Sequence, residues 1–228
     1  TNAPFIYDAT NYTPLTEAGT DVVGASHTAF FKSDLFFAKG DVLTFTAPYT
    51  DNDFDAGNGA GNISVGSNIT GLIAFRDQLI IFSENKIDRL VGNTIADFVL
   101  QPVTRNIGCI DSDTIREVAG DVVFLGPDGI RSLSGSDKVG DFDLAVISKT
   151  IQKEVTDVIS SNDSFMSVTI KNKSQYRLLG FNSNISDSAA TGIIGTQLAG
   201  PQGSMFGWSE TRGFKAFVAD SNYKAKTE

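Results

Sequence analysis

The chain has 228 residues, of which 41% are hydrophobic, and a formal net charge of −9. Its 27 Asp and Glu outnumber 18 Lys and Arg, which argues against tight binding of DNA or RNA because neutralised phosphates supply most of that affinity. No apolar run approaches the ~20 residues that cross a bilayer, so we expect no membrane span.

The first residue and the single cysteine set further limits. Because the chain begins with Thr1 and no signal-peptide pattern follows, we expect a processed product or a piece of a longer polypeptide. Cys109 is the only cysteine, which excludes an intrachain disulfide and a Cys-based zinc site. Its apolar neighbours predict a small buried side chain.

In chain order, residues 1–25 show no clear pattern and are expected to form an irregular segment or one strand of a preceding sheet. From residue 26 onward, apolar runs of four alternate with polar turns. The runs are Leu35–Ala38, Leu79–Phe82 and Val122–Leu125. Their β-branched and aromatic residues, bounded by Gly, Asp and Asn, are typical of strands.

Two markers give these strands a common period of about 44 residues. Phe31 and Phe75 are 44 positions apart, and Phe75 and Val118 are 43 apart. An Asp-Phe pair also recurs every 44 positions, at Asp53-Phe54, Asp97-Phe98 and Asp141-Phe142. Four-stranded propeller blades have repeats of about 40–45 residues. The period therefore predicts an all-β, β-propeller-like repeat domain that forms a partial or open ring.

The physical logic of such a repeat is that a small sheet has two apolar faces, which only neighbouring sheets can bury. The 17 Phe residues are expected to supply much of this packing. The sequence predicts four blade units, near residues 27–46, 63–92, 107–135 and 164–181.

The fourth unit differs because it includes a short amphipathic helix, predicted over residues 147–159. Ile147, Ile151, Val155 and Val158 recur at helical spacing. Ser148 is the expected N-cap, and the polar run at 160–163 is expected to end the helix.

Beyond the helix, the pattern predicts strands at 165–170 and 175–181. Residues 186–203, rich in Gly, Ala and Ser, are expected to be a long loop. Residues 204–218 are expected to complete this blade or begin another. The expected organisation is thus an N-terminal segment at 1–25, three repeats at 26–135 and an altered fourth repeat at 136–228.

No motif predicts a catalytic centre or a cofactor site. His27, the only histidine, has no accompanying nucleophile motif, so a structural place at the start of a strand is expected. Asp111, Asp113 and Glu117 cluster as the acids of a glycosidase could, but turn positions explain them.

The acidic segment with Asp51, Asp53 and Asp55 is a candidate calcium loop, because alternate carboxylates can converge on one cation. The EF-hand pattern requires Gly and Glu where this chain has Ala56 and Asn62. Since its Asp-Phe pair also belongs to the repeat, we interpret the segment as a turn and expect no bound metal.

Two segments resemble a known family. They are ITGLIAFRDQLIIFSENKIDRLVG, Ile69–Gly92, and QPVTRNIGCIDSDTIREVAGDVVFLGPDGIRSLSG, Gln101–Gly135. Their Asn-Ile-Gly-Cys, Val-Phe-Leu-x-x-Asp-Gly-Ile and Leu-x-Gly elements resemble the propeller region of tail nozzle proteins, or tail tubular proteins B, of short-tailed bacteriophages, including cyanophages. The resemblance covers roughly residues 26–151.

The resemblance implies a non-enzymatic structural protein of the virion. Family members form rings, often hexamers, around the channel through which DNA leaves the capsid, and they contact other tail and adaptor proteins. An acidic lumen would let DNA pass without tight binding. Members are usually several times longer than this chain, so the resemblance implies that it is a portion of such a protein.

Two other functions fit a propeller. One is a carbohydrate-binding or host-receptor-binding domain that uses the loops on one face. The other is a propeller glycosidase. An aromatic-lined groove with convergent acids would favour these two, whereas exposed apolar blade edges would favour the tail component.

Overall fold

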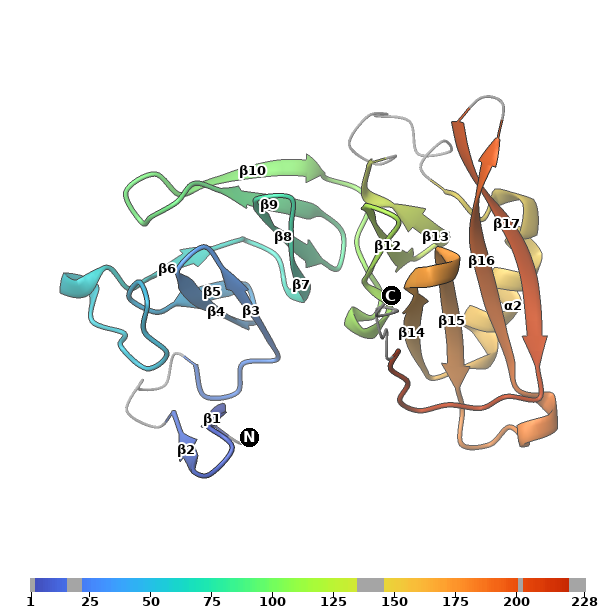
Figure 1. Ribbon diagram of the computed structural model, residues 1–228, viewed down its shortest axis with the longest axis horizontal. Helices are drawn as coiled ribbons and strands as arrows, with labels where there is room; N and C mark the ends of the chain where they lie inside the picture. The colour runs from blue at the N-terminus through green and yellow to red at the C-terminus, as the bar shows by residue number, and fades with distance from the viewer. Residues whose placement is uncertain (1–2, 16–21, 135–145, 201–202, 222–228) are drawn as a thin grey trace, which may run out of the picture. The chain divides into compact units, whose positions relative to one another are not determined.

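The computed structural model describes residues 3–15, 22–134, 146–200 and 203–221 (Figure 1). Most of the described elements are strands, which pair in five antiparallel sheets. The chain divides into two compact units, Thr1–Cys109 and Ile110–Glu228.

The first unit contains two four-stranded sheets in which strands pair in chain order. One consists of β3 (His27–Phe31), β4 (Asp34–Lys39), β5 (Val42–Phe45) and β6 (Gly61–Ser64). The other consists of β7 (Ile69–Phe75), β8 (Gln78–Ser83), β9 (Ile87–Val91) and β10 (Val99–Thr104). In each sheet a two-residue turn joins the first strand to the second. Both residues of the turn Arg76-Asp77, between β7 and β8, have positive φ, as a type I′ hairpin requires.

The two predicted units of this region are confirmed as sheets, but one boundary is wrong. Ile63, predicted to open the second unit, lies in β6 and pairs with Leu43 of the first sheet. The long connection before it, with the 3-10 helix η1 (Ala56–Asn58), returns the chain to the edge of that sheet. Each of these two blades therefore ends one strand later than predicted.

A shared hydrophobic core joins the facing sides of the two sheets. Phe36 and Phe45 of the first sheet and Leu79 and Ile81 of the second are buried in it. Phe98, from the repeated Asp-Phe pair, packs against the Phe36 and Phe45 rings with centroid separations of 5.9 and 5.6 Å. Fully burying one such side chain stabilises the fold by about 1.5–3 kcal/mol.

The other face of the first sheet is covered by the N-terminal segment. Strands β1 (Phe5–Tyr7) and β2 (Tyr12–Pro14) pair with each other as a separate ribbon. Ile6 of this ribbon packs in a cluster with Phe37 and Phe54. Phe54 thus occupies the position in its blade that Phe98 occupies in the next, which explains the repeat of the pair. Asp141-Phe142 lies outside the described residues.

The second unit contains two further sheets. The third sheet consists of β11 (Arg116–Val118), β12 (Asp121–Gly126) and β13 (Gly129–Ser132), preceded by the 3-10 helix η2 (Ser112–Thr114). The fourth consists of β14 (Ser164–Ile170), β15 (Gln175–Phe181), β16 (Thr191–Gly200) and β17 (Gly203–Arg212), with the 3-10 helices η4 (Lys171–Lys173) and η5 (Asp187–Ala189) between strands. These four sheets and the short helix confirm the all-β, propeller-like fold.

The predicted helix is present, displaced toward the C-terminus by a few residues. The 3-10 helix η3 (Lys149–Ile151) leads into α2 (Gln152–Ser161), whose Val155 and Val158 are buried. Ser148 is the N-cap residue of η3 rather than of α2, and its side chain makes no capping hydrogen bond. Its Oγ instead accepts a hydrogen bond from the Ile130 amide at 3.0 Å.

That hydrogen bond reflects how the third sheet ends. Val146 forms an isolated antiparallel bridge with Arg131, and the Ile147 amide donates to the Ile130 carbonyl at 3.0 Å. The chain thus touches the edge of β13 briefly and then turns into the helix. In the described part of this blade, a helix follows where the first two blades add a fourth strand.

The predicted loop at 186–203 is wrong over most of its length, because β16 and β17 form a hairpin of ten paired positions. Small residues suggested a loop, but here they allow close packing. A Cβ at Gly195 would lie 2.5 Å from the Trp208 ring, which fills the space above it. Residues 204–212 therefore complete the fourth blade.

Candidate functional site

The candidate residues from the sequence lie in strands and turns, where they take part in the pairing and hydrogen bonds of the fold. His27 is the first residue of β3 and pairs with Ala38. Cys109 is buried, as expected, and its amide donates to the Ser83 carbonyl. No helix in the described ranges is long and apolar enough to cross a membrane.

The carboxylates of the candidate calcium loop bond to their own turn. Asp53 accepts from the Asp55 amide at 2.9 Å and from Asn58 Nδ2 at 2.8 Å. Asp55 accepts from the Gly57 amide at 2.8 Å and caps η1. Among residues 3–15, 22–134, 146–200 and 203–221, no three His, Cys, Asp or Glu side chains are grouped as metal ligands. That this segment binds no metal stays a prediction.

The acids at 111–117 connect two sheets of the second unit. Asp111 accepts from the Asp113 amide with one oxygen and from the Phe165 amide of β14 with the other, both at 3.0 Å. The main-chain carbonyls of Asp113 and Glu117 accept hydrogen bonds from hydroxyls of β14. Asp111 is thus a link between η2 and the fourth sheet.

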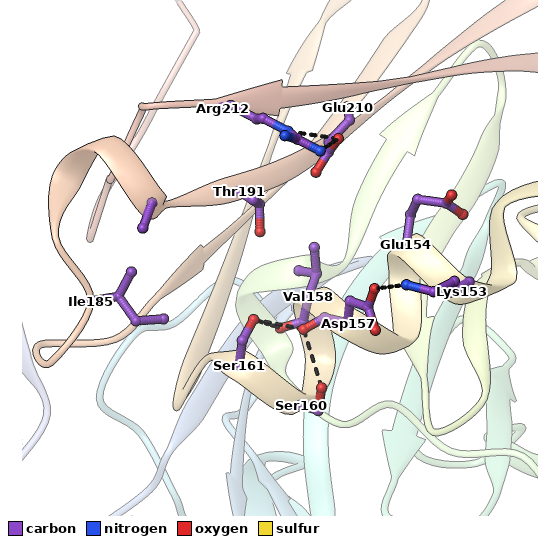
Figure 2. Close-up of a pocket in the computed structure, with 11 residues that line it drawn as sticks. Lys153, Glu154, Asp157, Val158, Ser160, Ser161, Ile185, Thr191, Glu210 and Arg212 are labelled. Atoms are coloured by element: carbon purple, nitrogen blue, oxygen red, sulfur yellow. Dashed lines mark hydrogen bonds and ion pairs between the residues drawn. The ribbon is translucent and has the colours of Figure 1, made fainter.

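A different region forms the cavity of interest, a groove of about 590 Å³ in the second unit. One wall is the polar face of α2, and the other is the end of β17, as Figure 2 shows. The segment between β15 and β16 contributes the remaining side. The lining residues are Lys153, Glu154, Asp157, Val158, Ser160, Ser161, Ile185, Ala189, Thr191, Glu210 and Arg212.

Each wall of the groove carries an ion pair. On α2, Lys153 Nζ lies 2.6 Å from Asp157 Oδ2. On β17, Arg212 donates to Glu210 Oε2 from Nε at 2.9 Å, and its Nη2 lies 2.8 Å from the same oxygen. The Asp157 carboxylate raises the pKa of Lys153, with smaller contributions from Glu154 and Glu210. Glu210 likewise raises the pKa of Arg212.

Apolar and hydroxyl groups complete the lining. Ile185 and Ala189 supply apolar surface, whereas Val158 is only 2% exposed. The hydroxyl groups of Ser160 and Ser161 donate to the main-chain carbonyl of Asp157 at 3.2 and 2.6 Å. Both hydroxyls are therefore used in hydrogen bonds within the last turn of the helix. Among the described residues that line it, none is aromatic, so its chemistry is that of a polar site with a small apolar floor.

Comparisons with known proteins add a low-level structural likeness. No protein-family model matches the chain, and no curated protein matches its sequence. Kluyveromyces lactis Hsv2p is similar over 89% of this chain and 63% of its own, with 8% identity and a TM-score of 0.44. The N-terminal domain of Nup159 is similar over 80% of this chain and 47% of its own, with 10% identity and a TM-score of 0.39. The chain therefore spans less than two thirds of either structure.

Proposed function

We propose that this chain is a structural component of a bacteriophage tail, in the nozzle or tail tube, where it forms part of the DNA ejection channel. Its partners would be further copies in a ring, a form that is often hexameric in the family that the sequence resembles, together with other tail and adaptor proteins. In this role the protein is part of the virion and performs no catalysis.

The observation that carries this proposal is that the family-like segments form propeller-type sheets, one of which packs against another sheet of the first unit. Ile69–Gly92 contains β7, β8 and β9, and Gln101–Gly135 runs from β10 through β13. In the first unit, Phe36, Phe45 and Phe98 lock one blade onto the next. A stack of this kind supplies rigid surface, as a tube wall requires.

The ribbon β1–β2 offers a surface for assembly. Phe5, Tyr7 and Tyr12 are 55%, 64% and 58% exposed, and the Phe5 and Tyr12 rings lie 4.4 Å apart. Clustered exposed aromatics of this kind mark protein interaction sites, because they bury large area at little entropic loss. Such a ribbon supports the proposed contacts with tail proteins.

Electrostatics support passage of DNA without tight binding. The net charge of −9 repels phosphates, and a surface that repels DNA lets it slide. Charge reversal inside the channel is therefore expected to change genome ejection more than assembly.

The test is quantitative mass spectrometry of purified virions, with electron microscopy of the isolated polypeptide for rings. We expect the polypeptide at a fixed copy number in particles. The triple variant Phe5→Ser, Tyr7→Ser, Tyr12→Ser is expected not to be incorporated into particles. Tyr49→Asn is the matched control, because Tyr49 is 92% exposed but lies outside the ribbon. Absence of the polypeptide from particles, with accumulation as a soluble monomer, would overturn the proposal.

The second candidate function is carbohydrate or host-receptor binding, for which the groove at α2 and β17 offers a polar cavity, although its described lining has no aromatic residue. Hydrolysis of a glycan has less support. A glycosidase needs one acid and one base or nucleophile facing across its pocket, whereas Asp157 and Glu210 are each bonded to a cation.

A further inference from the structure

We propose that the groove between α2 and β17 is a binding site for a neutral carbohydrate, which it recognises through pairs of adjacent hydroxyl groups. This inference concerns a site on the second unit and does not depend on the proposed place in a phage tail. A tail protein could carry such a site, and so could a free binding domain.

The two ion pairs provide the recognition chemistry. In each pair a carboxylate acceptor and a cationic donor lie side by side, 2.6 Å apart at Lys153–Asp157 and 2.8 Å apart at Arg212–Glu210. Neighbouring hydroxyls of a sugar have a similar oxygen separation, so one can donate to the carboxylate while the next accepts from the cation. Hydrogen bonds with a charged partner are about twice as strong as neutral ones.

The charge balance disfavours an anionic ligand. The described lining has three carboxylates, on Glu154, Asp157 and Glu210, and two cations, so an anion would meet a net negative site. A cation could bind Asp157 or Glu210 only by displacing Lys153 or Arg212, so Glu154 is the carboxylate at which a cation would compete with a sugar. A polyol adds hydrogen bonds to both pairs and breaks neither.

Size and floor also fit a sugar. A cavity of about 590 Å³ lies within the usual range for small-molecule sites and has room for a mono- or disaccharide. Ile185 and Ala189 offer apolar surface to the C–H face of a pyranose ring. Figure 2 shows Thr191 between the two walls, where its hydroxyl can reach a ligand that spans them.

The fold holds the backbone of both walls, whereas the Lys153 and Arg212 side chains that line the groove are 82% and 74% exposed. Val155 and Val158 anchor α2 in the core of the second unit. β17 is paired with β16 along its whole length, and Trp208 Nε1 donates to the Ile147 carbonyl just before the helix at 3.1 Å. Sites on rigid elements lose less entropy when a ligand binds.

The test is a titration of the full chain, by calorimetry and saturation-transfer NMR, with glucose, galactose, mannose, N-acetylglucosamine, lactose, maltose and chitobiose. At about 10 mM ligand a millimolar site is roughly nine-tenths filled. We expect at least one sugar to saturate. Glu210→Gln and Asp157→Asn are each expected to weaken it about tenfold or more, the loss for a hydrogen bond to a charged group. Glu117→Gln is the control because Glu117 is an exposed acid of the same unit outside the groove.

Spermidine and phosphate serve as cation and anion probes. Saturation by either of these in place of every sugar would overturn the inference. The same conclusion would follow if no sugar bound, or if sugar binding survived both substitutions with the fold intact by circular dichroism. The tail proposal is tested on particles, so its failure would leave these results unchanged.

Discussion

The two compact units bury their sheets by different means. In the first, two complete four-stranded blades meet through apolar side chains, with Phe36, Phe45 and Phe98 at the centre. In the second, a three-stranded sheet and a helix share a core with the fourth sheet. Hydrogen bonds also cross between those elements, as from Tyr176 Oη to the Thr114 carbonyl at 2.8 Å. A repeat of about 44 residues therefore predicts the strands of each sheet better than it predicts which elements pack against the faces of that sheet.

The largest expected effect lies in the aromatic core of the first unit. Phe36→Ala removes a ring that is 0% exposed and contacts Phe31, Phe45 and Phe98. We expect the free energy of unfolding to fall by about 3–5 kcal/mol, because the cavity adds to the lost transfer energy. Urea denaturation measures this. Phe30→Ala is the control, since Phe30 is 65% exposed, and an equal loss there would contradict the account.

The glycine at the hairpin of the second unit gives the next largest effect. Gly195→Ala places a methyl group 2.5 Å from the Trp208 ring, so the ring or the strand must shift. Overpacking of this kind costs about 1–3 kcal/mol. Fluorescence of Trp208, the only tryptophan, reports the shift during thermal unfolding. Ala199→Ser, at an exposed position of β16, should leave both the spectrum and the melting temperature unchanged.

Gly195 also explains why the sequence predicted the first unit better than the second. The apolar runs of β4 and β8 and the period between them are local signals, and these strands are confirmed. The Gly-rich β16 carries no such signal, because its glycines pair with bulky residues on other strands, such as Trp208 and Leu179. A pattern of small residues specifies a strand only once its neighbours are known.

The groove could be predicted only in part. Helical spacing correctly places Val155 and Val158 inside and therefore Lys153, Glu154 and Asp157 outside. Nothing local indicates that Glu210 and Arg212, more than fifty positions later, form the opposite wall. The two walls come together because β16 and β17 form a hairpin, and the sequence pattern predicted a loop over β16.

Removing the polar link at Asp111 tests the second unit's use of hydrogen bonds. Asp111→Ala leaves the Phe165 and Asp113 amides without their acceptor. We expect a loss of about 1–3 kcal/mol, as for a missing helix cap combined with an unsatisfied amide. Asp113→Ala is the matched control, because Asp113 is exposed and its main-chain bonds survive. Equal melting temperatures for the two variants would show that the link does not stabilise the unit.

Acid titration should affect turns of the first unit that depend on carboxylates. Amide bonds from Thr94 and Asn93 lower the pKa of Asp97 below its ordinary value of 3.8. The folded state therefore favours the charged form, and this stabilisation is present above pH 3.8 and is lost as the pH falls through the lowered pKa. Asp97→Asn should flatten the dependence of unfolding free energy on pH below 4. An unchanged slope would contradict this origin.

The smallest effect is expected from calcium at Asp51–Asp55, in the connection between β5 and β6. Asp53 and Asp55 already accept hydrogen bonds from their own turn, so a cation would have to compete with three donors. If the calcium concentration were a hundred times the dissociation constant of a site here, binding would stabilise the folded state by about 2.7 kcal/mol. That would raise the melting temperature by roughly 10 °C in a unit of this size. We expect a shift below about 2 °C in scanning calorimetry at millimolar calcium, the same for Asp53→Asn as for the unmodified chain. A larger shift that a chelator reverses, and that Asp53→Asn abolishes, would make this turn a metal site and give the first unit a ligand of its own.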